Sequence, residues 1–272
     1  MRNLLFLFAA MFLFASCRSN ELIRPGDSLD VAYEKALNQY EEENYAEAAR
    51  AFETVISIGR GTDIGQDAQF YLAESYFNNR RYLLAASEYE RYAQFHPNSP
   101  RREEADYKRA LSYYNLSPRY RLDQSYTYQA IENFRLLLSR FPNSEYADEA
   151  AGYISELRGK LAHKSYNAGE FYKRTNRFEA AAVYFDIVID NYPETSWAEL
   201  ALVDQMESYI LYAENSIAAR QVERFEMALE SYETYLQLFP RGENRSRVED
   251  LYDRAQRGLN DASDNESVAQ QN

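Results

Sequence analysis

The sequence predicts an all-α protein built from repeated pairs of helices, and three observations carry this prediction. The chain repeats itself at a spacing of 37 residues, in three copies that stay in register. The prolines lie at the ends of segments with helical periodicity, where helices stop. No stretch shows the sustained period-two alternation of a strand, so no sheet is expected. The aligned positions are Tyr33, Phe70 and Tyr107; Ala36, Ala73 and Ala110; and Tyr40, Phe77 and Tyr114.

A second landmark marks the later helix of each pair. It is an Ala followed four positions later by an aromatic residue and eight positions after that by a Pro. The Ala and the aromatic residue share one helix face, where the small side chain lets a neighbouring helix approach and the ring fills the adjacent space. The copies are Ala85/Tyr89/Pro97, Ala130/Phe134/Pro142, Ala181/Phe185/Pro193 and Ala228/Tyr232/Pro240, with Ala48/Phe52 lacking the Pro.

An earlier helix precedes each of these segments. It reads Leu72-Ala73-x2-Tyr76 in the second unit and Ala168-Gly169-x2-Tyr172 in the fourth. With the later helix, this pattern resembles the tetratricopeptide repeat, in which each helix pair buries one face against its neighbours. The resemblance covers about residues 29–240 in five units. Units three and five carry extra residues between their helices, around Ser117–Tyr128 and Ala213–Arg224.

The array has a joining helix in its middle and a cap at its end. Residues 145–175 keep helical periodicity without a Pro, which predicts one long helix or two nearly collinear ones. A helix over Asn244–Leu259 is expected to cap the stack, and the polar residues 260–272 are expected to be a disordered tail. The predicted fold is therefore an all-α tetratricopeptide-repeat superhelix of about five helix pairs with a C-terminal capping helix.

The first sixteen residues have the features of a signal peptide. Arg2 forms a charged n-region, and the apolar run Leu4–Phe14 is too short to span a bilayer but suits an h-region. Phe14-Ala15-Ser16-Cys17 then resembles a bacterial lipobox, with Phe14 where Leu is usual. We expect removal of residues 1–16, covalent lipid such as palmitate on Cys17, and a tether over residues 17–28. A plain secretory signal with a chance Cys is the alternative.

The residues after Cys17 bear on the destination. Arg18-Ser19-Asn20 lacks the Asp that retains some lipoproteins in the inner membrane, and it lacks an acidic run associated with surface export. By this resemblance, the expected location is the cell outer membrane, with the chain lipid-anchored and facing the periplasm.

Composition excludes several kinds of chemistry. The 43 acidic residues against 30 basic ones give a net charge of −13, which disfavours nucleic acid as a partner. One Cys and two His leave no intramolecular disulfide and no Cys/His zinc site, and no phosphate loop, GxSxG or HExxH motif occurs. We expect no enzyme activity, no metal, no cofactor other than the lipid on Cys17, and no small-molecule substrate.

The aligned rings are the candidate peptide-binding residues. They are spaced seven apart on the first helix of each of three units, so they are expected to line one continuous groove. Such a groove suits an extended or partly folded peptide that carries its own aromatic residues. Packing of these rings between helices is the alternative. The six residues are Tyr33, Tyr40, Phe70, Phe77, Tyr107 and Tyr114.

Several segments together resemble the five-repeat lipoprotein family of the β-barrel assembly machinery. These segments are Phe141-Pro142-Asn143-Ser144-x-Tyr146, Tyr166-x2-Gly169-x-Phe171-Tyr172, Arg177-Phe178-x-Ala180-Ala181 and Asn191-Tyr192-Pro193-x-Thr195, in addition to the lipobox. The resemblance implies a non-enzymatic scaffold that binds the periplasmic domains of the β-barrel insertase and the targeting segments of unfolded outer-membrane proteins. It implies peptide capture by repeats 1–3, residues 29–143, and partner docking by repeats 4–5 and the cap, residues 144–259.

Two other kinds of protein remain open from the sequence. One is a glycan-binding repeat lipoprotein of a nutrient-uptake system, against which the single Trp and the absence of a long loop argue. The other is a repeat lipoprotein that coordinates cell-division or cell-wall complexes, in which a trimerising coiled coil would be expected and no sustained heptads are seen.

Overall fold

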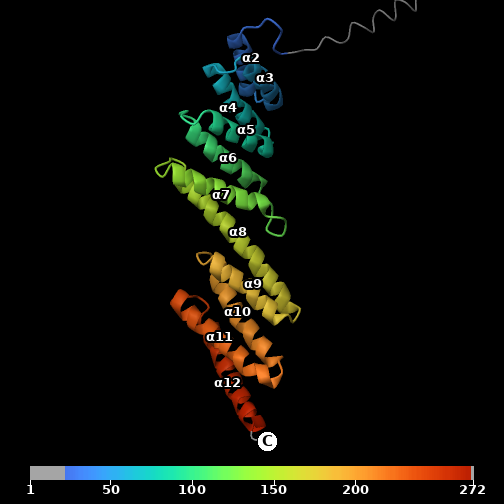
Figure 1. The fold of residues 1–272 in the computed structure, drawn as a ribbon, viewed down its shortest axis with the longest axis vertical. Coiled ribbons are helices and arrows are strands. Elements are labelled where there is room, and N and C mark those ends of the chain that lie inside the picture. The colour runs from blue at the N-terminus through green and yellow to red at the C-terminus, as the bar shows by residue number, and fades with distance from the viewer. Residues whose placement is uncertain (1–21, 271–272) are drawn as a thin grey trace, which may run out of the picture. The chain divides into compact units, whose positions relative to one another are not determined.

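The computed structural model describes residues 22–270, with side chains as far as residue 267, so the leader and Cys17 lie outside the described residues. Within this range the chain is all-α, as the sequence predicts: it forms helices joined by turns, and no strand (Figure 1). The helices are α2 (Leu29–Glu41), α3 (Tyr45–Ile58), α4 (Asp63–Asn78), α5 (Tyr82–Phe95), α6 (Arg102–Leu116), α7 (Ser125–Arg140), α8 (Ala147–Arg174), α9 (Phe178–Asn191), α10 (Ser196–Glu214), α11 (Ala218–Leu238) and α12 (Arg245–Gln270).

The chain forms two compact units, one ending at Asn115 and one beginning at Leu116. In the first, called here the N-terminal unit, α2, α3, α4 and α5 pack on one another in chain order. In the second, the C-terminal unit, α7 to α12 do the same. The break falls inside the third predicted repeat rather than between residues 143 and 144, because a connection of residues 117–124 separates α6 from α7, whereas α7 packs on α8.

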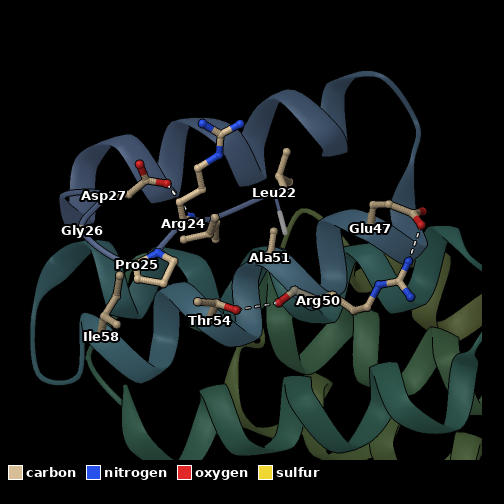
Figure 2. Close-up of a pocket in the computed structure, with 11 residues that line it drawn as sticks. Leu22, Arg24, Pro25, Gly26, Asp27, Glu47, Arg50, Ala51, Thr54 and Ile58 are labelled. Carbon is tan, nitrogen blue, oxygen red and sulfur yellow. Dashed lines mark hydrogen bonds and ion pairs between the residues drawn. The ribbon is translucent and has the colours of Figure 1, made fainter. Parts of the chain in front are cut away.

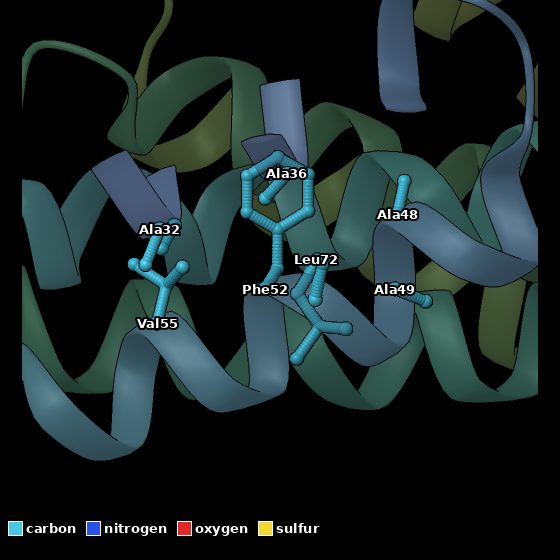
Figure 3. Packing of buried hydrophobic residues seen from close by; sticks show 9 residues of the cluster. Ala32, Ala36, Ala48, Ala49, Phe52, Val55 and Leu72 are labelled. Atoms are coloured by element: carbon cyan, nitrogen blue, oxygen red, sulfur yellow. The ribbon is translucent and has the colours of Figure 1, made fainter. Parts of the chain in front are cut away.

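Small residues at repeat positions allow close helix packing in the N-terminal unit. Figure 3 shows Phe52 of α3 beside Ala36 of α2 and Leu72 of α4, in a cluster of buried apolar side chains. Phe52 and Ala36 are fully buried, and so are the other aligned alanines, Ala73 and Ala110. The aligned Ala positions and Phe52 are therefore core positions, where a larger or smaller side chain would disturb the packing.

Three of the turns inside helix pairs share one backbone conformation. Glu43, Arg80 and Asn176 have φ angles of 61°, 57° and 58°, each in the left-handed region. Each follows a helix end by two residues, and the next backbone N–H returns to a carbonyl of the last helical turn, for example Arg81 N to Tyr76 O at 2.8 Å. The repeat thus extends to the turns, although none of the three residues is a glycine.

The long helix predicted over residues 145–175 is α8, a single helix of 28 residues. Its first half packs on α7, where Tyr153 stacks on Phe134 with ring centroids 5.3 Å apart. Its second half packs on α9, where Gly169 leaves room for the ring of Phe185. A Cβ at position 169 would lie 2.6 Å from that ring, so the close approach requires glycine.

Two expectations about the end of the chain are wrong. The extra residues around Ala213–Arg224 do not form a long connection, because α10 and α11 are themselves longer, with 19 and 21 residues, and only residues 215–217 lie between them. The cap does not end at Leu259, and the disordered tail expected from residue 260 is helix as far as Gln270. No Pro interrupts this segment, and Ala262, only 4% exposed, continues the buried face of Ala255 one heptad later.

Candidate functional site

The six candidate rings lie on α2, α4 and α6, all in the N-terminal unit. Phe70 and Tyr107 are only 4% and 6% exposed, so these two do not line an open groove, and the packing alternative holds for them. Phe70 meets the rings of Tyr89 and Tyr92 edge-on, with centroids 6.0 and 5.4 Å away. The other four are half-buried and keep part of their surface accessible: Tyr33, Tyr40, Phe77 and Tyr114.

A buried carboxylate joins the helices at the centre of this face. Glu74 of α4 is 7% exposed. It accepts hydrogen bonds from the hydroxyl of Tyr40 in α2, at 3.3 Å, and from the hydroxyl of Tyr89 in α5. The ammonium of Lys108 in α6 lies 3.1 Å from Oε1 and 3.2 Å from Oε2 of Glu74, as an ion pair. One side chain therefore ties together the first helices of three successive pairs.

Half-buried rings and a cation lie next to this carboxylate. The Lys108 ammonium is 5.1 Å from the centroid of the Phe77 ring, within the range of a cation–π contact. Asn78 donates to the hydroxyl oxygen of Tyr40 at 3.0 Å, which fixes that ring. The Lys108 side chain remains 23% exposed. This face, defined by Tyr40, Glu74, Phe77 and Lys108, is called the aromatic face below.

Charge and burial determine the protonation of the two tyrosine hydroxyls that donate to Glu74. Burial raises the pKa of Tyr40 and of Tyr89, and the negative charge of Glu74 and the hydrogen bonds to it raise both further. Both phenols therefore stay protonated at neutral pH and act as donors. The aromatic face presents rings and a Lys cation, with its single buried carboxylate already occupied.

A second cation lies over the rings at the start of α6. The guanidinium carbon of Arg101 is 4.9 Å from the Phe70 ring centroid and 5.2 Å from that of Tyr71. Asp67 lies 3.9 Å from its Nη1, and this buried nitrogen has no hydrogen-bond partner among the described residues. Burial, together with the charge of Asp67, raises the pKa of neighbouring Tyr33 to about 12. The Arg101 side chain is 36% exposed, so the accessible part of its guanidinium can donate hydrogen bonds to a further anionic or carbonyl group.

The C-terminal unit also has a buried carboxylate that is surrounded by a Tyr hydroxyl and by cations. Asp204 of α10 is 2% exposed. It accepts a hydrogen bond from Tyr166 and one from Lys173 at 2.9 Å, both on α8. Arg247 of α12 reaches it at 2.7 Å and also pairs with Glu207 at 2.8 Å. We call these five side chains the Asp204 cluster; they attach the capping helix to α10 and α8.

Electrostatic compensation in the Asp204 cluster is strong. Burial alone would raise the pKa of Asp204, but the hydrogen bonds from Tyr166 and Lys173 and the charges of Lys173 and Arg247 outweigh it and lower that pKa. Burial likewise opposes the charge of Lys173, yet its contacts with Asp204 raise its pKa. The carboxylate and both cations therefore remain ionised at neutral pH.

The central charges of both units were missed from the sequence. Glu74 directly follows the aligned Ala73, and Lys108 directly follows the aligned Tyr107. Their place beside the repeat positions was a usable signal, but an acidic or basic residue on an amphipathic helix is usually solvated. The contacts of Glu74 reach 34 residues along the chain to both Tyr40 and Lys108, which no local pattern reveals.

The described part of the chain was compared with the arrangements that hold metal ions and with the helices that cross membranes. No group of three or more His, Cys, Asp or Glu side chains there is arranged to hold a metal ion. Nor does any described helix combine the length and apolar character needed to cross a membrane. The charge clusters described above lie on α4 and its neighbours in the N-terminal unit and on α8, α10 and α12 in the C-terminal unit.

Comparison with solved structures finds helical repeat proteins. The TPR domain of P58(IPK) matches with a TM-score of 0.41 and 15% identity, covering 86% of this chain and 66% of that one. The TPR2AB domain of yeast Sti1 in complex with pHSP90 matches with a TM-score of 0.40 and 13% identity, covering 84% and 98%. Both scores are low, and the repeat assignment rests on the helix pairs described above.

Sequence comparison is more specific. Relatives named outer membrane protein assembly factor BamD include that of Rickettsia prowazekii, 30% identical over 193 residues that cover 71% of this chain and 76% of the relative. Those of Caulobacter vibrioides and Vibrio cholerae are each 25% identical, covering 71% and 74% of this chain and 63% and 87% of the relatives. The YfiO family model, described as outer membrane lipoprotein, matches residues 26–225. Because this match includes most of the helix pairs, the chain belongs to the YfiO family of outer membrane lipoproteins.

Proposed function

We propose that this chain is a non-enzymatic scaffold lipoprotein of outer-membrane β-barrel assembly. The observation that carries the proposal is the family match over residues 26–225, together with relatives named as outer membrane protein assembly factors. Lipid on Cys17 holds the protein in the outer membrane, facing the periplasm. The repeats provide binding surfaces, which is how stacked helix pairs commonly act.

The aromatic face of the N-terminal unit binds the targeting segments of unfolded outer-membrane proteins. Half-buried rings next to a cation suit a peptide with an aromatic residue and a carboxylate, because the ring gains apolar burial and the carboxylate gains a charge-assisted hydrogen bond. Phe77 with Lys108 provides one such combination, and Tyr33 with Arg101 provides the other. Tyr33, Phe77 and Lys108 lie on the first helices of pairs and Arg101 directly precedes α6, so an extended peptide can contact several repeats.

The C-terminal unit binds the periplasmic domains of the insertase. Exposed apolar side chains on α8 and α9 support this assignment: Phe171, Val183 and Ile187 are 53%, 55% and 37% exposed. Val183 and Ile187 are four residues apart and so share one side of α9. Apolar side chains exposed together on one face are typical of protein interfaces.

The test is co-purification from membranes solubilised in detergent. The lipidated protein is expected to bring down the insertase, and Val183→Glu is expected to lose it because a charge then lies among the exposed apolar side chains of α9. Leu83→Glu is the matched control, since Leu83 is 52% exposed on α5 of the other unit. Recovery of a transporter of the nutrient-uptake kind, or of a cell-wall synthase, in place of the insertase would contradict the proposal.

A further inference from the structure

A hollow of about 710 Å³ lies between the start of the described chain and helix α3 (Figure 2). Residues 22–27 form one side, and Ala51, Thr54 and Ile58 line the other. These three lie three to four residues apart and therefore follow one face of α3. The hollow runs along the helix beside the point where the chain enters the fold, in the N-terminal unit.

Apolar side chains at this hollow remain uncovered. Leu22 is 39% exposed and Ile58 is 52% exposed, although both line it. Pro25, also exposed, lies between them in Figure 2. Exposed apolar side chains collected at one hollow favour a partner that brings apolar surface of its own.

One cation at the hollow forms no direct ion pair, although its charge helps to lower the pKa of Asp27. Arg50 pairs with Glu47, and Asp27 pairs with Lys35 at 2.6 Å. Arg24 forms no side-chain ion pair among the described residues. In a chain with a net charge of −13, the Arg24 guanidinium adds a positive charge at the edge of the hollow that Leu22 also lines. It fits a ligand with a negative group at one end and hydrocarbon at the other.

The length of chain before Leu22 identifies a source of such a ligand. Cys17 precedes Leu22 by five residues. A fully extended chain spans at most about 3.6 Å per residue, so an anchor at Cys17 holds Leu22 within about 18 Å of the membrane surface. The hollow is therefore tethered close to phospholipid, and no other described part of the chain is held there by so short a connection.

We propose that this hollow binds a membrane phospholipid, with its phosphate near Arg24 and its hydrocarbon against Leu22 and Ile58. The inference rests on the proposed lipid anchor at Cys17 and adds a second, non-covalent contact with the same membrane. Arg side chains commonly pair with lipid phosphates, and apolar side chains beside them enter the boundary between headgroups and acyl chains. The contact would fix which face of the N-terminal unit lies against the bilayer.

The test is photocrosslinking in membranes with the full lipidated chain. A benzophenone amino acid replaces Ile58 in one variant and Phe95 in the control, since Phe95 is 68% exposed on α5, which packs on α4 rather than on α3. The proposal expects a phospholipid adduct, detected by mass, at position 58 and at least about fivefold less at position 95. Equal lipid adducts at both positions, or only protein adducts at position 58, would overturn it.

A charge reversal tests the role of Arg24. Arg24→Glu is expected to lower the lipid adduct at position 58 at least about threefold, because the phosphate loses its partner. Arg91→Glu is the control, since Arg91 is an exposed arginine of α5. An Arg24→Glu variant with an unchanged adduct would remove the phosphate contact from the proposal and so overturn it.

Incorporation of labelled palmitate separates this inference from the proposed anchor. If Cys17 incorporates palmitate and position 58 forms no phospholipid adduct, the anchor stands and the hollow assignment fails. If Cys17 incorporates none, the anchor fails, and the mature chain is coupled through its single thiol to a maleimide phospholipid in vesicles. The same crosslinking comparison of positions 58 and 95 then decides the hollow assignment.

Discussion

The N-terminal and C-terminal units place a buried carboxylate at matching points and surround it differently. In each, the first helix of a pair supplies the acid, Glu74 on α4 and Asp204 on α10, and a Tyr of an earlier helix donates to it. Glu74 faces one Lys, which also covers the Phe77 ring. Asp204 faces two cations, one from α8 and one from the capping helix.

If the proposed function is right, this difference separates a peptide-binding surface from a set of contacts that only holds helices together. The cation of the N-terminal unit lies against an accessible ring, so a ligand can add contacts to both. Lys173 and Arg247 each pair with both Asp204 and Glu207, so the charges of the Asp204 cluster have partners within the cluster. The buried carboxylate of the N-terminal unit therefore leaves a cation and a ring partly accessible, whereas that of the C-terminal unit fixes the capping helix.

The largest expected loss of stability comes from removing the carboxylate of the Asp204 cluster. Asp204→Ala is expected to destabilise the C-terminal unit by about 3 kcal/mol, the low end for breaking a buried ion pair, because Lys173 and Arg247 keep Glu207. The chain's single Trp, Trp197, lies in this unit and reports its unfolding by fluorescence in urea. Glu74→Gln, measured by hydrogen exchange in α4, is expected to cost about 1.5 kcal/mol. Equal losses would remove the distinction between the two carboxylates.

Helix packing in α8 gives the next effect. Gly169→Ala is expected to destabilise the C-terminal unit by about 1 to 3 kcal/mol, because the new methyl group overlaps the ring of Phe185. Gly159→Ala is the matched control in the same helix, where a Cβ meets nothing within 4 Å. That control is expected to stabilise by about 0.5 to 1 kcal/mol through helix propensity. A neutral Gly169→Ala would mean that α8 and α9 are further apart than described.

Removal of the Tyr40 hydroxyl tests the hydrogen bonds of the aromatic face. Tyr40→Phe is expected to cost about 1 kcal/mol, because it removes the hydrogen bond to Glu74 and leaves the ring in place. The readout is hydrogen exchange of α2 and α4 amides. Tyr45→Phe serves as the control, since the Tyr45 ring meets Tyr40 edge-on and no hydrogen bond of its hydroxyl to Glu74 is found. A cost no greater than that of the control would count against the Glu74 network.

Low pH is expected to reduce the stability that Asp204 contributes. The pKa of Asp204 is lowered in the folded chain, so its contribution is complete above the unfolded value, about 3.9, and is lost as pH falls through the folded value. The stability difference between the unmodified chain and Asp204→Asn is therefore expected to shrink below about pH 4. Urea midpoints followed by Trp197 fluorescence at pH 7 and pH 3 measure it. A difference that grows on acidification would mean that the pKa of Asp204 is raised, not lowered, in the folded chain.

The sequence predicts the helix pairs of the fold more fully than it predicts which aligned rings are buried and which are accessible. The helix pairs follow from Ala and aromatic spacing, because that spacing reflects burial on one helix face, and the fully buried Ala36 and Phe52 confirm it. Burial of Phe70 and Tyr107 was not distinguishable from exposure of Phe77, because all are aligned rings and only the tertiary neighbours differ. The helix past Leu259 was missed because its polar sequence hides one buried position, Ala262.

The most direct test of the account is the affinity of the mature chain for a fluorescent peptide from the aromatic C-terminal end of an outer-membrane protein. Phe77→Ala is expected to weaken binding about tenfold, as loss of about 1.4 kcal/mol of ring contact requires, while hydrogen exchange shows the N-terminal unit still folded. Phe171→Ala, which removes an exposed ring from the other unit, is expected to leave binding within about twofold. Unchanged binding by a folded Phe77→Ala variant, or equal loss in both variants, would contradict peptide recognition by the aromatic face.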